Sequence, residues 1–192
     1  MGAVIVAWLL AATLLGVVMP VATPMDATPT AVPEPIWQAI EWTDLDGRTW
    51  HAEDLSDRVV LLDFWATWCP PCLAELPHLR QLQDRAEQDD RLVIVGIALD
   101  TIDRRRLRSF LRRQQIDWPQ VHERRGTRGE LARRFGVEAV PATFLIDRDG
   151  RLVARDLRGE GLDAAIDALL GPASANAALN RQRPPARRSD RR

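Results

Sequence analysis

Residues 59–79 read VVLLDFWATWCPPCLAELPHL and contain both cysteines of the chain, Cys69 and Cys72. The segment opens with VVLLDFW, an apolar and aromatic run interrupted by a single acid, Asp63, and such a run is typical of a strand buried on both faces. From Cys69 to about Arg85, leucines recur at helical spacing, which predicts an amphipathic helix. The cysteines are therefore expected where a buried strand turns into a helix.

The other elements follow from the same two periodicities. A strand, a helix and a second strand in succession require a right-handed crossover and a parallel pair, whereas a late hairpin adds antiparallel strands. This order predicts an α/β fold with a mixed central sheet, helices on both faces and an extra N-terminal β-hairpin. Two hairpins are predicted, one of residues 38–42 and 49–51 around Asp46-Gly47 and one of residues 142–147 and 152–156. A strand is predicted over residues 92–99, followed by a helix over 101–115 that is capped by Asp100. A short helix is predicted from a capping box at 127–130 to Gly136, and a last helix over 162–170.

The motif Trp68-Cys69-Pro70-Pro71-Cys72 has a spacing that lets the two sulfurs close a disulfide within the first helical turn. Cys69 is expected to face the unpaired backbone amides and the positive end of the helix dipole. Both stabilise a thiolate, so Cys69 is the predicted nucleophile. Cys72, one turn deeper, is predicted to stay protonated until it resolves the mixed disulfide. Pro70 and Pro71 preset helical φ where missing amide donors do no harm.

Asp63 lies six residues before Cys69, in the middle of the most apolar strand. Burial penalises the charged form of a carboxyl group and raises its pKa, which suits a proton acceptor for Cys72 during turnover. The alternative is an acid at the end of a strand, with a side chain that reaches water.

Two simpler interpretations of the cysteine pair remain open. The pair could be half of a zinc site completed by two of the histidines, but none of the three has the close paired spacing of zinc ligands. It could also be a purely structural disulfide, although so small a ring constrains the unfolded chain less than a long loop does. We favour neither, and we expect no metal and no cofactor. The three histidines are His51, His78 and His122.

The composition excludes several classes of function. The formal net charge is -1 and all 26 basic residues are arginines. The chain therefore lacks the strongly basic balance of a nucleic-acid-binding protein, and no mechanism can depend on lysine. Two cysteines are too few for a disulfide-rich scaffold or for a four-cysteine zinc site. We expect no nucleic acid among the partners.

The ends of the chain differ from its middle. Residues 2–19 are apolar and uncharged, long enough to cover about 27 Å as a helix, and they predict a membrane anchor or export signal within residues 1–20. An uncleaved anchor is favoured because no small-x-small cleavage site is clean. A tether rich in Pro and Thr (residues 21–35) then leads to the folded domain (residues 36–171), and an Arg-rich tail that is expected to be disordered follows (residues 172–192).

Three separated segments carry a family resemblance: DLDGRTWHAEDLSDRVVLLDFWA at residues 44–66, DFWATWCPPCLAELPHL at 63–79 and GVEAVPATFLIDRDGRLV at 136–153. In this order they resemble the thioredoxin fold, and specifically the membrane-tethered, extracytoplasmic TlpA/ResA/CcmG-like thiol-disulfide oxidoreductases. The resemblance covers roughly residues 36–171.

The resemblance implies roles for particular residues. Cys69 corresponds to the attacking cysteine and Cys72 to the resolving one, and Asp63 matches the buried acid of thioredoxin. Pro141 corresponds to a proline that follows a cis peptide bond and lies against the cysteines, which leaves the Val140 backbone free to pair with an extended substrate. The expected substrate-binding residues are Trp68, Pro70, Pro71, Val140 and Pro141.

The implied activity is reduction of disulfides in exported proteins, with apocytochrome c and copper-centre proteins as client types. Electrons are expected from a thiol donor in the membrane. The domain is expected to face the periplasm or extracytoplasmic space, held at the inner (cytoplasmic) membrane by the N-terminal segment. One alternative is a thiol peroxidase, whose site needs Thr three residues before the reactive cysteine, where Ala66 stands. Another is a Cu(I)-carrying module that uses the same two thiolates.

Overall fold

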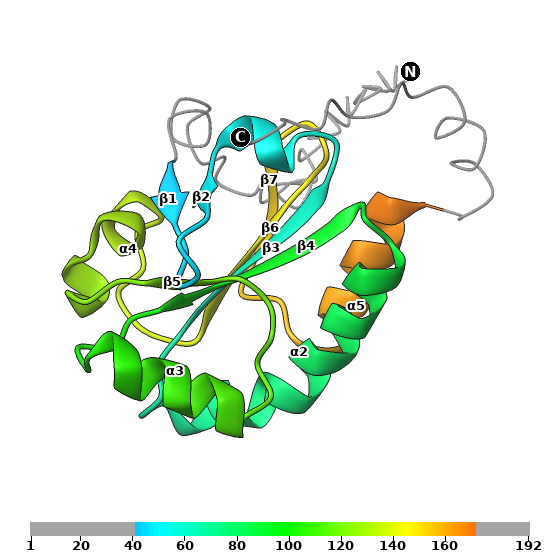
Figure 1. The fold of residues 1–192 in the computed structure, drawn as a ribbon. Helices are drawn as coiled ribbons and strands as arrows, with labels where there is room; N and C mark the ends of the chain where they lie inside the picture. Colours follow the sequence, from blue (N-terminus) through cyan, green and yellow to red (C-terminus); the bar gives the residue numbers. More distant parts are fainter. Residues whose placement is uncertain (1–40, 172–192) are drawn as a thin grey trace, which may run out of the picture.

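The structure, a computed structural model, describes residues 41–171 (Figure 1). The predicted anchor, tether and Arg-rich tail lie outside the described residues. None of the helices between residues 41 and 171 has the length and apolar character that crossing a bilayer requires.

A mixed five-stranded sheet in the order β5-β4-β3-β6-β7 forms the centre of the fold. The central strand, β3 (Val59–Trp65), runs parallel to β4 (Leu92–Ala98), and both are buried along their whole length, as their continuous apolar sequences require. On the other side of β3, β6 (Ala142–Ile146) and then β7 (Leu152–Arg155) are antiparallel. The short strand β5 (Gln120–His122) pairs parallel with β4 at the opposite edge. The predicted fold class is confirmed.

Three helices cover one face of the sheet (Figure 1). They are α2 (Pro70–Gln88), α3 (Arg104–Arg113) and α5 (Gly159–Leu170). Their apolar side chains pack in one core with Leu61 and Trp65 of β3, and Cys69 and Cys72 belong to the same core. The cysteine pair therefore sits in a packed layer and not on a loose loop.

The opposite face is covered by the N-terminal hairpin and by α4 (Glu130–Arg134). The hairpin consists of β1 (Trp42–Thr43) and β2 (Thr49–Trp50), as predicted although shorter. A 3₁₀ turn (Ala52–Leu55) connects the hairpin to β3. Side chains alternate across a strand, so residues 60, 62 and 64 of β3 face this second core, whereas residues 61, 63 and 65 face α2 and α5.

The helix after β4 begins later than predicted. Asp103, and not Asp100, is the N-cap, because its carboxylate accepts the backbone N–H of Arg106 at 2.9 Å. The predicted cap at Asp100 is therefore wrong. Both acids are good caps by residue type, but Asp100 is fully buried and its carboxyl group is occupied elsewhere, as described below.

The start of the short helix was also predicted wrongly. Thr127 lies in a 3₁₀ turn (Gly126–Arg128), and α4 follows the N-cap Gly129, so the expected capping box does not form. A β-carbon at position 129 would meet the carboxyl group of Glu123, so the Glu123 side chain would have to move for a larger residue to stand there. The strand β5 was not predicted, because three residues are too few to show a periodicity.

Candidate active site

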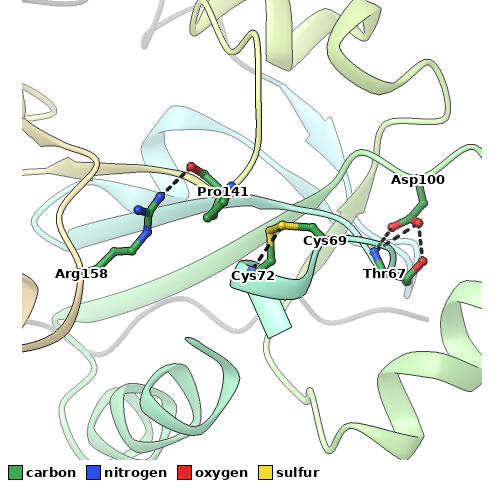
Figure 2. Close-up of a disulfide and its surroundings, with 6 residues drawn as sticks. All are labelled: Thr67, Cys69, Cys72, Asp100, Pro141 and Arg158. Atoms are coloured by element: carbon green, nitrogen blue, oxygen red, sulfur yellow. Dashed lines mark hydrogen bonds between the residues drawn. A yellow bond between two sulfur atoms is a disulfide. The ribbon is translucent and has the colours of Figure 1, made fainter. Parts of the chain in front are cut away.

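Cys69 and Cys72 are joined by a disulfide at the amino end of α2 (Figure 2). Cys69 is the N-cap residue of the helix, and its sulfur accepts the backbone N–H of Cys72 at 3.2 Å. The Cα atoms lie 5.3 Å apart, so the bridge closes within one helical turn. The two residues are only 2% and 3% exposed. The helix start thus places an amide donor against the sulfur of Cys69, as expected from the sequence; the separate roles of the two cysteines stay predictions.

An apolar rim surrounds the bridge. Trp68 is 66% exposed and is the exposed large hydrophobic side chain of the described residues. Pro70 and Pro71 occupy the first two helical positions and are exposed as well. Exposed aromatic and apolar side chains beside a buried disulfide offer a contact surface to a partner protein.

Pro141 lies in the loop before β6, and the Val140–Pro141 peptide bond is cis. Val140 packs against the core that contains both cysteines. The carbonyl of Pro141 accepts a hydrogen bond from a guanidinium nitrogen of Arg158 at 2.6 Å. In Figure 2, the Pro141–Arg158 pair is drawn on one side of the disulfide and Thr67 on the other. Their contacts with a client stay predictions.

The loop before Cys69 is held by Asp100. The carboxyl oxygens of Asp100 accept the hydroxyl of Thr67 at 2.6 Å and its backbone N–H at 3.0 Å (Figure 2). The backbone carbonyl of Asp100 also lies 2.9 Å from Nε2 of His122. Because Asp100 has no exposed surface, these bonds fix the loop from inside the protein.

Asp63 is 5% exposed and points from the middle of β3 toward the layer that contains α2 and α5. Burial raises the pKa of Asp63 from its ordinary value of 3.8 to about 7, while the positive charge of Arg158 lowers it and the negative charge of Glu75 raises it. The predicted direction of the shift agrees with this, and the acid does not stand at a strand end. Its role as proton acceptor stays a prediction.

The histidines do not gather around the cysteines. His78 lies 3.0 Å from a carboxylate oxygen of Asp163 on α5, and His51 pairs with Glu41 at the hairpin. In the described part of the chain, no three His, Cys, Asp or Glu side chains are placed to hold a metal ion. The half-zinc-site interpretation therefore finds no ligand set within residues 41–171.

Two residues of the site were missed by sequence reasoning. Asp100 was assigned to a helix cap, although an acid directly after a buried parallel strand lies at the sheet edge where the neighbouring strand also ends. Arg158 gave no signal, because it is one of 26 basic residues and stands in a loop.

The sequence profile described as "AhpC/TSA family" matches residues 34–155. The thiol-disulfide oxidoreductase ResA of Bacillus thuringiensis subsp. konkukian is 30% identical over 118 residues, which cover 62% of this chain and 65% of that protein. A solved thiol-disulfide oxidoreductase from Bacteroides fragilis superposes with a TM-score of 0.62 at 28% identity, over 68% of this chain and 96% of that one.

A putative thiol:disulfide interchange protein DsbE from Chlorobium tepidum superposes with a TM-score of 0.60 at 28% identity, over 69% of this chain and 93% of that one. The match to the curated ResA protein of Bacillus thuringiensis covers 65% of that protein, which is slightly less than two thirds of its length. Proteins similar to this chain in sequence and in fold carry names that denote thiol-disulfide exchange.

Proposed function

The chain belongs to the AhpC/TSA family, and on this premise we propose that it is a thiol-disulfide oxidoreductase that reduces disulfides of client proteins through Cys69 and Cys72. The observation that carries the proposal is the Cys69–Cys72 bridge in the first turn of α2, beside the exposed Trp68. A purely structural disulfide has no need of an exposed aromatic side chain beside it, whereas a redox-active disulfide needs a surface that the client protein can contact.

The reaction consists of two thiol-disulfide exchanges. In the reduced protein, the Cys69 thiolate attacks one sulfur of the client disulfide, which forms a mixed disulfide and releases the other client sulfur as a thiolate. Cys72 then loses its proton and attacks the sulfur of Cys69, which releases the second client thiol and leaves the Cys69–Cys72 bridge. A dithiol donor must return two electrons and two protons before the next cycle.

The protein supplies a group for each step. The backbone N–H of Cys72 donates to the sulfur of Cys69, which favours the Cys69 thiolate that attacks the client disulfide. With a pKa of about 7, the Asp63 carboxyl group can accept the Cys72 proton and release it again near neutral pH. The free backbone before Pro141 offers an edge to an extended client segment.

The setting outside the cytoplasm is part of the proposal and rests on the apolar residues 2–19 and the tether that follows them. These residues support an N-terminal anchor in the inner membrane. The resemblance to membrane-tethered thiol-disulfide oxidoreductases supports a thiol donor in the same membrane and exported clients such as apocytochrome c or copper-centre proteins. A C-terminal reporter enzyme that is active only outside the cytoplasm should give signal. Activity of a cytoplasmic reporter at the same position would refute this topology.

The function is tested with Cys69→Ser and Cys72→Ser in the full chain. Disulfide reduction with dithiothreitol as donor should be lost in Cys69→Ser, because no attacking thiolate remains. Cys72→Ser should still attack and should accumulate a mixed disulfide with the client, visible by non-reducing electrophoresis. Insulin serves as the client disulfide. If Cys69→Ser keeps reducing insulin, or if Cys69→Ser rather than Cys72→Ser accumulates the mixed disulfide, the assigned chemistry is wrong.

The same preparations separate the two alternatives. In the structure, the hydroxyl of Thr67 is committed to Asp100, and Ala66 occupies the position that a peroxidase threonine would need. We therefore expect peroxide consumption far slower than insulin reduction. A Cu(I) carrier would instead bind the metal tightly through both thiolates and leave insulin intact.

A further inference from the structure

Arg158 connects two parts of the site that come from different elements. It stands in the loop between β7 and α5, at the N-cap position of α5. Its guanidinium group donates to the carbonyl of Pro141 at 2.6 Å, as Figure 2 shows. The loop that is expected to receive a client is therefore held by a side chain that arrives from beyond β7.

Arg158 also comes from the chain that packs against the strand beside Asp63. Asp63 pairs in the sheet with Thr143, and the hydroxyl of Thr143 donates to the carbonyl of Leu157, the residue before Arg158, at 2.8 Å. The positive charge of Arg158 accordingly lowers the pKa of Asp63. The backbone neighbours of Asp63 in the sheet are Gly96 of β4 and Thr143 of β6, neither of which carries a charge. From α2, the titratable side chains are the thiol of Cys72, in the reduced protein, Glu75, whose charge opposes that of Arg158, and His78, which lies 3.8 Å from Glu75. From α5, they are Glu160, Asp163, which pairs with His78 and Arg85, and Asp167, which pairs with Arg85. Arg158 is the cation whose charge lowers the pKa of Asp63, and the chain contains no lysine.

We infer that Arg158 is a positioning residue that joins the client-binding loop at Pro141 to the proton acceptor Asp63, so that one side chain holds the loop and increases the ionised fraction of the acid for the resolving step. The inference rests on the proposed function, because it assigns Arg158 to the step in which Cys72 gives up its proton.

Two opposing influences set the protonation state of Asp63. Burial and the negative charge of Glu75 favour the protonated acid, and Arg158 favours the ionised acid. Only the ionised form can accept a proton from Cys72. Without the guanidinium charge, a larger fraction of Asp63 is protonated at neutral pH and resolution slows. Arg158 is exposed, so solvent screens its charge and the effect is moderate.

The experiment follows both exchange steps with the reduced full chain and 5,5′-dithiobis(2-nitrobenzoate) in a stopped-flow instrument. Attack by Cys69 releases one coloured thiolate at a rate that depends on reagent concentration, and resolution by Cys72 releases a second at a rate that does not. In Arg158→Gln, the pH midpoint of resolution should rise by about half a unit and the rate at pH 7 should fall about twofold, with attack unchanged. Arg158→Lys keeps the charge and should restore the midpoint.

Arg155→Gln is the matched control. Arg155 also donates to a backbone carbonyl, that of Phe135 at 3.3 Å, but it packs over Phe144 in the other core. This variant should leave the midpoint of resolution where it is. An equal shift in Arg155→Gln and Arg158→Gln would mean a general loss of surface charge and would overturn the inference.

A readout without turnover separates this inference from the proposed function. In an NMR titration of the side-chain carboxyl carbons, the pKa of Asp63 should be higher in Arg158→Gln than in the unaltered chain, and an unchanged pKa would overturn the inference. If the carboxyl titration shifts but the unaltered chain releases no coloured thiolate, the proposed function fails, and the role of Arg158 in turnover fails with it.

Discussion

Asp63 and Asp100 are both buried acids, but the protein holds them in opposite ways. Asp100, just beyond the end of β4, accepts the hydroxyl and the backbone N–H of Thr67. The carboxyl group of Asp63, in the middle of β3, accepts no hydrogen bond from the residues between 41 and 171, and burial raises its pKa to about 7. An acid surrounded by donors fixes a loop, whereas an acid without them is left able to take up a proton.

Removing Asp100 should have the largest effect. Asp100→Ala leaves the hydroxyl and the backbone N–H of Thr67 without their acceptor, and we expect the free energy of unfolding to fall by about 3 kcal/mol. Urea denaturation followed by tryptophan fluorescence measures this loss. Attack by Cys69 should slow as well, because the loop that precedes it is no longer held.

The matched control for Asp100→Ala is Thr67→Val. This variant loses only the hydroxyl bond and keeps the backbone N–H bond, so it should cost about 1 kcal/mol. If Asp100→Ala lowers the free energy of unfolding no more than Thr67→Val does, then Asp100 does not hold the loop through both groups. The difference between Asp100 and Asp63 would then not lie in their hydrogen bonds.

Replacing Asp63 should have a smaller effect of opposite sign on stability. The folded-state pKa of about 7 lies above the ordinary value of 3.8, so between these values the folded protein binds more protons than the unfolded chain. Stability should therefore decline as pH rises from about 4 to about 7 and should level off above that range. Asp63→Asn removes this decline and should be more stable than the unaltered chain by about 1–2 kcal/mol at pH 8, the buried amide offsetting part of the gain.

Kinetics sharpen the same comparison. Asp63→Asn should slow the resolving step about tenfold at neutral pH and leave the attack by Cys69 almost unchanged, because the acid serves Cys72. Equal slowing of both steps, or a stability curve with the same pH dependence as that of the unaltered chain, would show that Asp63 is only a buried polar residue.

Much of the fold was predictable because its central elements carry strong patterns. The run VVLLDFW and the strand at residues 92–98 are continuous apolar segments, and both became fully buried parallel strands. The last helix was bounded by Gly171, whose φ of +63° suits glycine at a helix end. Prediction failed where two residues of similar type compete for one role, as Asp100 and Asp103 did for the cap of α3.

The sequence by itself determined the cysteine pair at the start of a helix, the burial of Asp63 and the class of the fold, because each depends on residues close together in the chain. Only the tertiary structure decided which side chains complete the site. Thr67 and Asp100 are 33 residues apart, and Pro141 and Arg158 are 17 apart. Pairings at such separations depend on the order of the strands and on the path of each loop, and no local periodicity encodes them.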